Sequence, residues 1–420
     1  MRPNSVVIID EHATVTGGAT RVAVDEAVGL AATGVSVTYL ASIGPTCDEL
    51  SRSSVRVILL GQKRLVDARD NPSVLLQNLW NSAAFRAIDT LVNDLDPRTT
   101  VIHVHGFSQT LSGSPIRCAL DRGFPVLFTL HDYFTCCPNG GFFDYPAKRV
   151  CQRRPLSFTC VARNCDKRNY AHKLYRVAST QARRYLGRIP SELKYFIGVS
   201  HSSVQRLRPY LPSDATFFFL RNPCSIPKTA PAAPQSHSHV AAIGRLSPEK
   251  GLEILLDAAR HSGTQLLFIG DGPLRRTIEA AGPHRVTGWV SRSEVHRLLE
   301  SVRCLALPSL WPETFGLSVM DAAARGIPSI VTNVCGAAEL IDHGRTGWRV
   351  PPGDVDALAA CLETVKDDPT IATIGQTVYT EYWRSPSSLD VHIHQLLQIY
   401  ERILGSLPLR DHAETTSQFS

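Results

Sequence analysis

The sequence has 420 residues, of which 43% are apolar and 20% charged, and its formal net charge is +6. Two domains are expected at this length, and the composition is that of a soluble globular protein rather than a disordered or fibrous one. The charge is too small to indicate nucleic-acid binding, and no apolar run approaches the roughly 20 residues that span a bilayer. The opening segment has only a short apolar run before acids follow, which favours a buried strand over a secretory signal and predicts a cytoplasmic protein.

In the first half, strand-like apolar runs alternate with segments long enough for helices. The runs are rich in Val, Ile and Leu, and they occupy residues 5–10, 35–41, 55–60, 100–107 and 125–132. This alternation is typical of a parallel α/β sheet. Gly17 and Gly18 follow the first run, where they form either an ordinary tight turn or a place for close approach of a phosphate. His105 and His131 stand at the ends of later strands, and the pattern alone leaves their roles open.

Five of the eleven cysteines fall within 30 residues, from Cys136 to Cys165. Cytosolic cysteines are mostly reduced, and four thiolates can hold a structural zinc. The spacing is irregular and contains no C-x2-C pair, so packed free thiols in an ordered loop are equally consistent with it. The candidate zinc ligands are Cys137, Cys151, Cys160 and Cys165.

Residues 167–190 contain seven basic side chains and no acid, with no proline before the last position, which suits a helix. One interpretation is a solvated helix face. The other is a basic surface that meets anionic lipid or a phosphate-bearing acceptor.

A Pro-, Ala- and Ser-rich segment then predicts an interdomain linker at residues 226–239, after a first domain of residues 1–225. Strand and helix patterns restart and predict a second, similar domain over residues 240–384. A helix at about residues 385–406 is expected to pack back on the first domain, and residues 410–420 are expected to be disordered. Two doubly wound domains facing each other across a cleft have room for a ligand on each side.

Two loops of the second domain carry charges suited to a sugar nucleotide. Arg245 and Lys250 flank a Ser-Pro turn, where cations beside a helix start suit a diphosphate, although a capped helix entry explains them as well. In WPETFGLSVMDAAARGIP, Glu313 lies in a loop and Asp321 about one turn into a helix that is otherwise poor in charge. Asp94 and Asp96 form a D-x-D before a strand, which a helix-ending turn explains better than a metal site.

Four segments of the second domain together resemble the retaining GT-B glycosyltransferases of family 4 (group 1). They are GRLSPEKG, IGDGPLR, PETFGLSVMDAAARGIP and CGAAELIDHGRTGWRVPPGD, and their order and spacing agree over about residues 240–360. The first domain resembles the family more loosely, through VTGGATRVAVDEAVGL, VIHVHGF and TLHDY. The resemblance implies the α/β GT-B fold, with two Rossmann-like doubly wound domains.

It also implies roles for particular residues around a nucleotide-sugar donor. Arg245 and Lys250 would bind the diphosphate, and Glu313 would contact the transferred sugar. The backbone amides of Phe315, Gly316 and Leu317 would bind sugar and phosphate oxygens.

The second acid of the family's E-x7-E pair contacts the ribose, and this sequence has the shorter Asp321 there. Gly17 and Gly18 match the family's glycine loop, which lets the backbone approach the donor phosphates. His105 matches a family histidine near the reacting sugar, and His131 is a second candidate for that role.

The expected activity is transfer of a sugar from a UDP- or GDP-sugar to a glycan or lipid-linked acceptor, in cell-surface polysaccharide or glycoconjugate synthesis. Front-face substitution assisted by the leaving phosphate needs no catalytic metal, and no other cofactor or nucleic acid is expected. Peripheral contact with an anionic membrane at its inner face is a further expectation. The alternatives are a non-catalytic GT-B scaffold protein and a GT-B sugar-nucleotide epimerase; no G-x-G-x-x-G follows the first strand, which disfavours a nicotinamide dehydrogenase.

Overall fold

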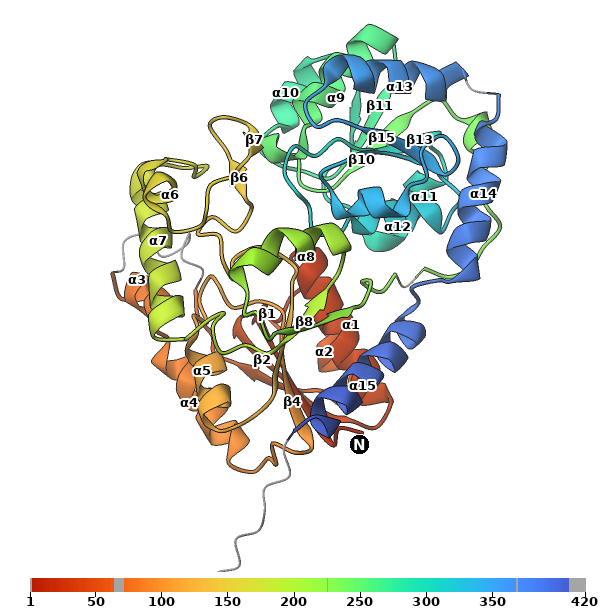
Figure 1. Cartoon of the computed structure of the whole chain (residues 1–420). Coiled ribbons are helices and arrows are strands. Elements are labelled where there is room, and N and C mark those ends of the chain that lie inside the picture. The colour runs from red at the N-terminus through yellow and green to blue at the C-terminus, as the bar shows by residue number, and fades with distance from the viewer. Residues whose placement is uncertain (1, 64–71, 225, 368, 408–420) are drawn as a thin grey trace, which may run out of the picture.

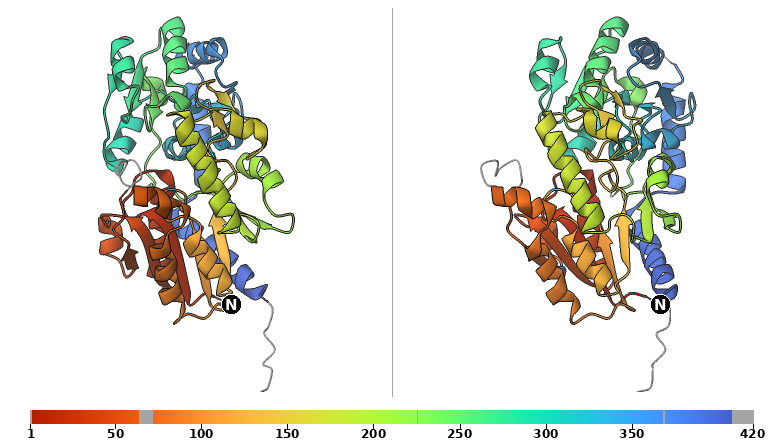
Figure 2. Two further views of the ribbon diagram at one scale, coloured as in Figure 1. Left: turned by 90° about the vertical axis from the view of Figure 1, so that its left-hand side faces the viewer. Right: turned by 60° about the vertical axis from the view of Figure 1, so that its left-hand side comes forward.

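The computed structural model describes residues 2–63, 72–224, 226–367 and 369–407. It consists of two parallel β-sheets in two domains, each sheet covered by helices on both faces (Figures 1 and 2). Each sheet has two hydrophobic cores, one against each face. The predicted fold class, α/β with two doubly wound domains, is confirmed. The tail expected to be disordered lies outside the described residues.

The first domain is built on a seven-stranded sheet with the order β3-β2-β1-β4-β5-β8-β9, in which all neighbouring strands are parallel. The order changes direction between β1 and β4, and ligands of open α/β sheets bind beyond the carboxyl ends of strands at such a point. The strands are β1 (Ser5–His12), β2 (Ser36–Ile43), β3 (Arg56–Leu59), β4 (Thr100–Val104), β5 (Val126–Thr129), β8 (Tyr195–Gly198) and β9 (Thr216–Phe219).

Helices and one small antiparallel pair complete this domain. The pair, β6 (Phe143–Asp144) with β7 (Arg149–Val150), lies in the long insertion between β5 and β8. The helices are α1 (Gly18–Ala32), α2 (Asp48–Ser51), α3 (Pro72–Leu79), α4 (Ser82–Val92), α5 (Ser114–Asp121), α6 (Phe158–Ala162), α7 (Tyr170–Tyr185) and α8 (His201–Leu207).

The second domain has a six-stranded parallel sheet with the order β12-β11-β10-β13-β14-β15, which changes direction between β10 and β13. Its strands are β10 (Val240–Ile243), β11 (Leu266–Ile269), β12 (Arg285–Val286), β13 (Cys304–Leu307), β14 (Ser329–Thr332) and β15 (Gly347–Val350). Its helices are α9 (Leu252–Ser262), α10 (Arg275–Ala280), α11 (Arg292–Leu299), α12 (Leu317–Ala323), α13 (Val355–Asp367) and α14 (Ile371–Arg384).

The last helix, α15 (Leu389–Gly405), returns to the first domain and lies along α1 and β4 (Figure 1). Its apolar stripe joins the core beneath α1, and each fully buried Leu or Ile contributes roughly 1.5–3 kcal/mol. His392 and Tyr400 lie on the same buried face. This helix therefore brings two polar side chains under the first sheet's switch point.

The basic stretch does form a helix, α7, but some of its cations point inward. Lys173 is 0% exposed and Arg183 is 4% exposed, and Arg176 is half-buried. The Arg183 guanidinium lies 5.6 Å from the ring centre of Phe107 and 5.8 Å from that of Phe134. Neither a solvated face nor a basic surface describes these residues, because their positive charges are used in packing the helix onto the domain.

Candidate active site

The switch point of the second sheet brings two predicted donor residues into direct contact. Lys250 follows β10 and Glu313 follows β13, and the two strands are neighbours. Lys250 Nζ lies 2.8 Å from Glu313 Oε2, with the ammonium 5.7 Å from the ring centre of Trp311. The Ser309 hydroxyl donates to the other oxygen of Glu313. The lysine and the carboxylate therefore form one half-buried polar unit.

Arg245 lies on the same loop but differs from Lys250 in exposure. Its side chain is exposed and makes no hydrogen bond or ion pair with the other described residues. A free guanidinium at the carboxyl edge of the sheet is available to an anionic ligand.

The loop that carries Glu313 also touches the first domain. The Thr314 hydroxyl donates to the carbonyl oxygen of His131 at 2.8 Å, and the Tyr133 hydroxyl donates to the Pro312 carbonyl at 2.8 Å. The Ser200 hydroxyl donates to the Thr314 carbonyl at 2.6 Å. These bonds hold the predicted sugar-facing loop against the strand end that carries His131.

Two glycine segments face each other where the domains meet. Gly316 caps α12 with φ 132°, a left-handed conformation that side chains rarely adopt, and a Cβ there would lie 2.7 Å from that of Ala337. A Cβ on Gly18 would lie 2.9 Å from the side chain of Leu317, whereas one on Gly17 would meet nothing. The start of α1 therefore lies against the start of α12, whose backbone amides are predicted from the sequence to donate hydrogen bonds to sugar and phosphate oxygens. Phe315 is buried in a hydrophobic cluster that also contains Val199 of the first domain and Met320 of α12.

Asp321 is mostly buried and already has neighbours. Its Oδ1 lies 3.3 Å from Cys224 Sγ, 3.8 Å from a nitrogen of Arg292 and 4.0 Å from His296 Nε2. Burial raises the pKa of Asp321, and the positive charge of Arg292 opposes this effect. The predicted ribose contact stays a prediction.

The two predicted histidines are in contact, but they differ in what their rings can still bind. His105 Nδ1 lies 2.9 Å from His131 Nε2. His105 Nε2 lies 3.2 Å from Glu26 Oε2, so both nitrogens of this buried ring face protein groups. His131 is half-buried, and no described residue hydrogen-bonds its Nδ1. Burial, followed by the charge of His105, lowers the pKa of His131 to about 3, so its ring is neutral near pH 7.

Glu26 of α1 connects this histidine pair to the C-terminal helix. Its Oε1 lies 2.9 Å from His392 Nε2, and His392 Nδ1 lies 2.8 Å from the Arg221 carbonyl oxygen. A carbonyl only accepts, so Nδ1 of His392 carries a hydrogen, and a proton must also lie between Nε2 and Glu26. Burial alone raises the pKa of Glu26, but His105 and His103 together lower it well below its usual value. The carboxylate is therefore an anion held by the surrounding histidines.

His103 completes this buried network. Its Nδ1 lies 2.7 Å from the Tyr400 hydroxyl and its Nε2 lies 2.7 Å from that of Thr129. Its Nδ1 also lies 3.3 Å from Glu26 Oε2. Burial lowers the pKa of His103 well below its usual value, so the ring is neutral.

Two family models match the chain. The model for the glycosyl transferase 4-like domain matches residues 17–185, and the model for glycosyl transferases group 1 matches residues 229–377. The chain belongs to the group 1 glycosyltransferases. The resemblance stated from the sequence is thus confirmed, and the matched ranges include the glycine loop, both histidines and both donor loops.

Similar proteins of this glycosyltransferase family include the glycogen synthase of Mycobacterium tuberculosis, which is 35% identical over 206 residues. That match covers 44% of this chain and 48% of the relative, so the chain spans about half the length of the curated relatives it matches. Among solved structures, Anabaena HepE in complex with UDP-glucose has a TM-score of 0.66 at 17% identity, covering 95% of this chain and 99% of that one. The sucrose-phosphate synthase of Thermosynechococcus elongatus has a TM-score of 0.68 at 18% identity, covering 96% and 100%. These neighbours confirm the GT-B fold.

Two site residues of this group 1 glycosyltransferase, Glu26 and His392, were not predicted from the sequence. Glu26 lies on the buried face of α1, between Ala23 and Ala27, where an apolar residue is expected. The helical spacing of apolar residues in α1 places Glu26 on the buried face. Buried carboxylates are rare unless they are paired, so this position could have indicated a buried polar partner. His392 likewise interrupts the apolar stripe of α15.

Within the described ranges, one group of three metal-ligating side chains has its ligand atoms within 4.8 Å of one another, namely Glu26, His103 and His105. The hydroxyls of Tyr400 and Thr129 engage both ring nitrogens of His103, and His131 engages Nδ1 of His105. His105 Nε2 lies 3.2 Å from Glu26 Oε2, but neither atom makes an aligned hydrogen bond.

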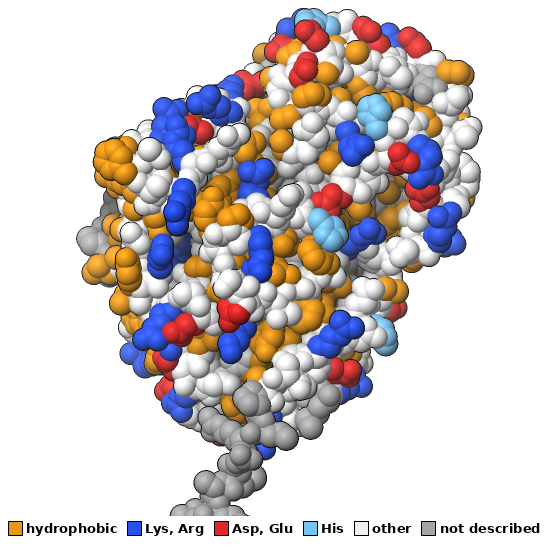
Figure 3. Space-filling view, viewed as in Figure 1, with side chains coloured by type: hydrophobic (Ala, Val, Ile, Leu, Met, Phe, Trp, Pro, Cys, Tyr) orange, Lys and Arg blue, Asp and Glu red, His pale blue; other side chains and the backbone are white. Residues whose placement is uncertain are grey.

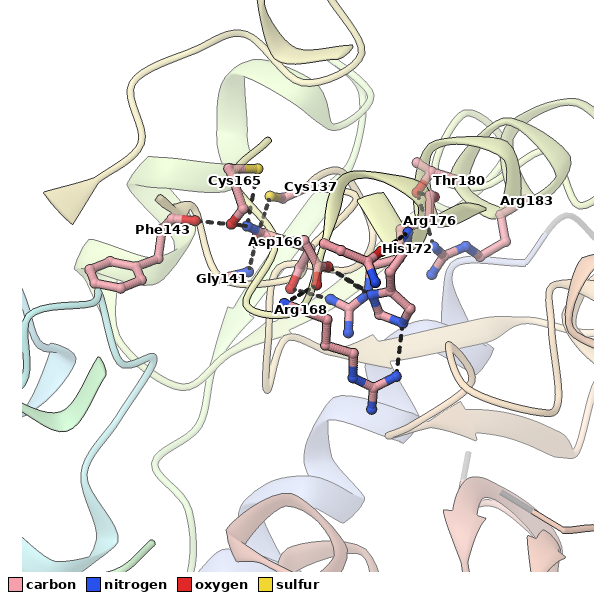
Figure 4. Close-up of polar contacts among 12 residues, drawn as sticks. Cys137, Gly141, Phe143, Cys165, Asp166, Arg168, His172, Arg176, Thr180 and Arg183 are labelled. Carbon is pink, nitrogen blue, oxygen red and sulfur yellow. Dashed lines mark hydrogen bonds and ion pairs between the residues drawn. The ribbon is translucent and has the colours of Figure 1, made fainter. Parts of the chain in front are cut away.

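The cysteines considered as zinc ligands are not gathered in such a group. The buried ammonium of Lys173 lies 3.6 Å from Cys160 Sγ, and Cys165 Sγ accepts from the Asn139 amide at 3.4 Å. Figure 4 shows Cys137 and Cys165 near the contacts of this insertion. The ammonium of Lys173 thus already supplies a positive charge beside these thiols.

Proposed function

We propose that the chain is a retaining glycosyltransferase that moves a sugar from a nucleotide-sugar donor to a glycan or lipid-linked acceptor. The observation that carries the proposal is the loop of Glu313. It holds a carboxylate paired with Lys250 on one side, and through Thr314 it bonds to His131 of the other domain. A donor bound at this loop has its diphosphate near the cations and its sugar near the cleft-facing histidine.

The donor phosphates are neutralised by Lys250 and the exposed Arg245. Negative charge grows on the leaving diphosphate as the anomeric C–O bond breaks, and positive side chains stabilise that charge. The amides at the start of α12, at Gly316 and Leu317, donate to phosphate and sugar oxygens. The close approach of Gly18 to Leu317 leaves the first domain's backbone near the same oxygens.

The transferred sugar lies between Glu313 and His131. The carboxylate accepts hydrogen bonds from sugar hydroxyls. We assign His105 the neutral tautomer with its hydrogen on Nε2, toward the Glu26 anion, so that its Nδ1 accepts from His131 Nε2. This leaves the lone pair of His131 Nδ1 to accept from a sugar hydroxyl, with His105 and Glu26 as positioning residues.

Retention follows from front-face substitution. The acceptor oxygen forms its bond to the anomeric carbon on the face from which the diphosphate leaves, and its proton passes to the leaving phosphate oxygen. The transition state is oxocarbenium-like. No residue of the chain is assigned as a covalent nucleophile, and no metal takes part in the proposed steps.

We place this activity at the inner face of a cytoplasmic membrane, in cell-surface polysaccharide or glycoconjugate synthesis. The solved neighbour HepE binds UDP-glucose according to its description, so UDP-glucose is the first donor to test, followed by other UDP- and GDP-sugars. None of the helices in the described residues is long and apolar enough to cross a membrane.

The test is incubation of the purified chain with a panel of UDP- and GDP-sugars, following thermal protection, slow hydrolysis and the anomeric configuration of the product by NMR. One donor is expected to raise the melting temperature and to be hydrolysed with retention, and Lys250→Met is expected to reduce both effects strongly. Protection by no nucleotide sugar would contradict the proposal. Protection without hydrolysis or transfer would support a scaffold protein, and a changed sugar configuration in the recovered donor would support an epimerase.

A further inference from the structure

The outer face of α6 and α7 exposes large apolar side chains. Phe158 is 86% exposed, Tyr185 72% and Leu186 53%, and Tyr170 and Leu174 are exposed as well. Positions 170, 174 and 185 of α7 fall on one side of a helix, because steps of four and eleven residues nearly complete whole turns. The helix therefore presents an apolar stripe to solvent.

This arrangement reverses the usual polarity of a surface helix, which has its charges outside and its apolar stripe inside. In α7 the charges of Lys173 and Arg183 are inside. Lys173 contacts Cys160, and Arg183 donates to the Ser179 carbonyl at 3.2 Å. The apolar stripe thus has no partner within the domain's own core.

The charge around the stripe has one sign. Residues 145–191 contain twelve Lys and Arg residues and a single acid, Asp166. Asp166 is buried, and it accepts from the Arg168 amide at 2.9 Å and lies 3.0 Å from His172 and 3.4 Å from Arg176 (Figure 4). Glu192 and Glu253 pair with Arg188 and Lys148 at the ends of this region, whereas no ion pair with a described acid engages Lys167, Arg168 or Arg184 beside the stripe. Lys and Arg side chains lie beside apolar ones over this region (Figure 3).

We infer that this surface docks on an anionic phospholipid bilayer. Aromatic and leucine side chains flanked by Lys and Arg are the composition of segments that lie in the interface plane, with the apolar side chains below the headgroups. Each basic residue near an anionic surface adds about 1 kcal/mol. The exposed cations Lys167, Arg168 and Arg184 flank the stripe. This composition fits a lipid surface better than a second copy of the same basic face, which would repel it.

Docking there has a consequence that rests on the proposed function. The insertion between β5 and β8 begins at His131 and carries α6 and α7, so the histidine and the docking surface belong to one connected segment. A bilayer bound at α7 would therefore lie against the domain that carries His131, which suits a lipid-linked acceptor.

The inference is tested by sedimentation with vesicles of phosphatidylcholine alone and of phosphatidylcholine with phosphatidylglycerol. Wild type is expected to pellet with the anionic vesicles and not with the neutral ones. The triple variant Phe158→Ser, Tyr185→Ser, Leu186→Ser should lose at least about fivefold of this binding, because it removes the side chains that enter the interface. Trp289→Ser is the matched control, since Trp289 is 68% exposed on the second domain and its loss should change nothing. Lys167→Gln with Arg184→Gln should weaken binding most at low salt.

The substituted side chains are exposed, so the variants should fold, and their melting temperatures check this. Binding of the triple variant equal to wild type, or equal pelleting of wild type with both vesicles, overturns the inference. So does a wild-type dimer in sedimentation velocity that the triple variant dissociates, which would make a second copy the occupant. Vesicle binding is measured without donor or acceptor, so its failure is distinct from failure of the proposed transfer activity.

Discussion

His105 Nδ1 lies 2.9 Å from His131 Nε2, and the opposite nitrogen of His105 lies 3.2 Å from Glu26 Oε2. The three groups form a line from the buried face of α1 to the interface of the domains. The contact between His105 and Glu26 has the distance of an ion pair, but neither atom makes an aligned hydrogen bond. Catalytic hydrogen bonds are often long in the absence of substrate and tighten in the complex.

The first prediction concerns His131. His131→Ala should lower kcat/KM by about 10- to 100-fold, because one hydrogen bond to the reacting sugar is lost. Its pKa near 3 means that no acidic limb of the pH profile between pH 5 and 8 comes from this ring. His131→Asn, which keeps an acceptor oxygen, should restore part of the activity. A kcat/KM of His131→Ala equal to wild type would remove the residue from the site.

The second prediction concerns Glu26, which acts through His105. Glu26→Gln should lower kcat while leaving the donor KM near its wild-type value, because a neutral amide no longer sets the orientation of the His105 hydrogen. Gln fills the same volume, and the melting temperature separates a positioning effect from unfolding. A matched fall in stability with unchanged kcat would show that Glu26 serves only the packing of α1 against α15.

The third prediction separates the two members of the 2.8 Å pair between Lys250 and Glu313. Lys250→Met should weaken UDP binding in calorimetry and lower kcat by about 10²- to 10³-fold, since it removes a charge that stabilises the leaving group. Glu313→Gln should lower kcat but leave UDP affinity equal or stronger, because Lys250 is then released from its partner. Equal loss of UDP affinity in both variants would show that the pair binds the nucleotide only as a unit.

The fold and the donor loops could be predicted from the sequence because their signals are local. Strands show as short apolar runs, and the loop of Glu313 follows one such run. The contact of Glu26 with His392 joins residues 366 positions apart, and it depends on where α15 lies, which no local pattern contains. The inward cations of α7 escaped prediction for another reason. Polarity alone predicts that Lys173 is exposed, whereas the thiols and aromatic rings beneath the helix make room for buried charge.

The fourth prediction addresses the short acid at position 321. Asp321→Glu should leave activity equal or improved, because the longer side chain keeps the carboxylate and extends its reach toward a ribose. Asp321→Asn should raise the donor KM by about tenfold, the size of one lost hydrogen bond to a charged group. Cys224→Ala is the control for the 3.3 Å contact between the thiol and Asp321. A large loss in Asp321→Glu would mean that the site is built around the shorter acid and its neighbour Arg292.

The last prediction concerns stability and pH. Burial raises the pKa of Asp10 from 3.8 to about 6, although the charge of His105 opposes the rise. The folded state therefore binds this proton more tightly than the unfolded state does. The resulting stabilisation is complete below about pH 3.8 and is lost as the pH rises through 6, a difference of about 3 kcal/mol at pH 7.5.

Asp10→Asn should accordingly raise the melting temperature at pH 7.5, and the gain should shrink toward pH 4. The Asn oxygen can still accept from the Tyr39 hydroxyl, which lies 3.3 Å from the Asp10 carboxylate. Neutral His103 and His131 destabilise both proteins equally as the pH falls, so their effects cancel in the difference between wild type and variant. Melting curves at several pH values between 4 and 7.5 provide the measurement. A difference that does not change with pH would mean that Asp10 is ionised in the folded protein throughout this range.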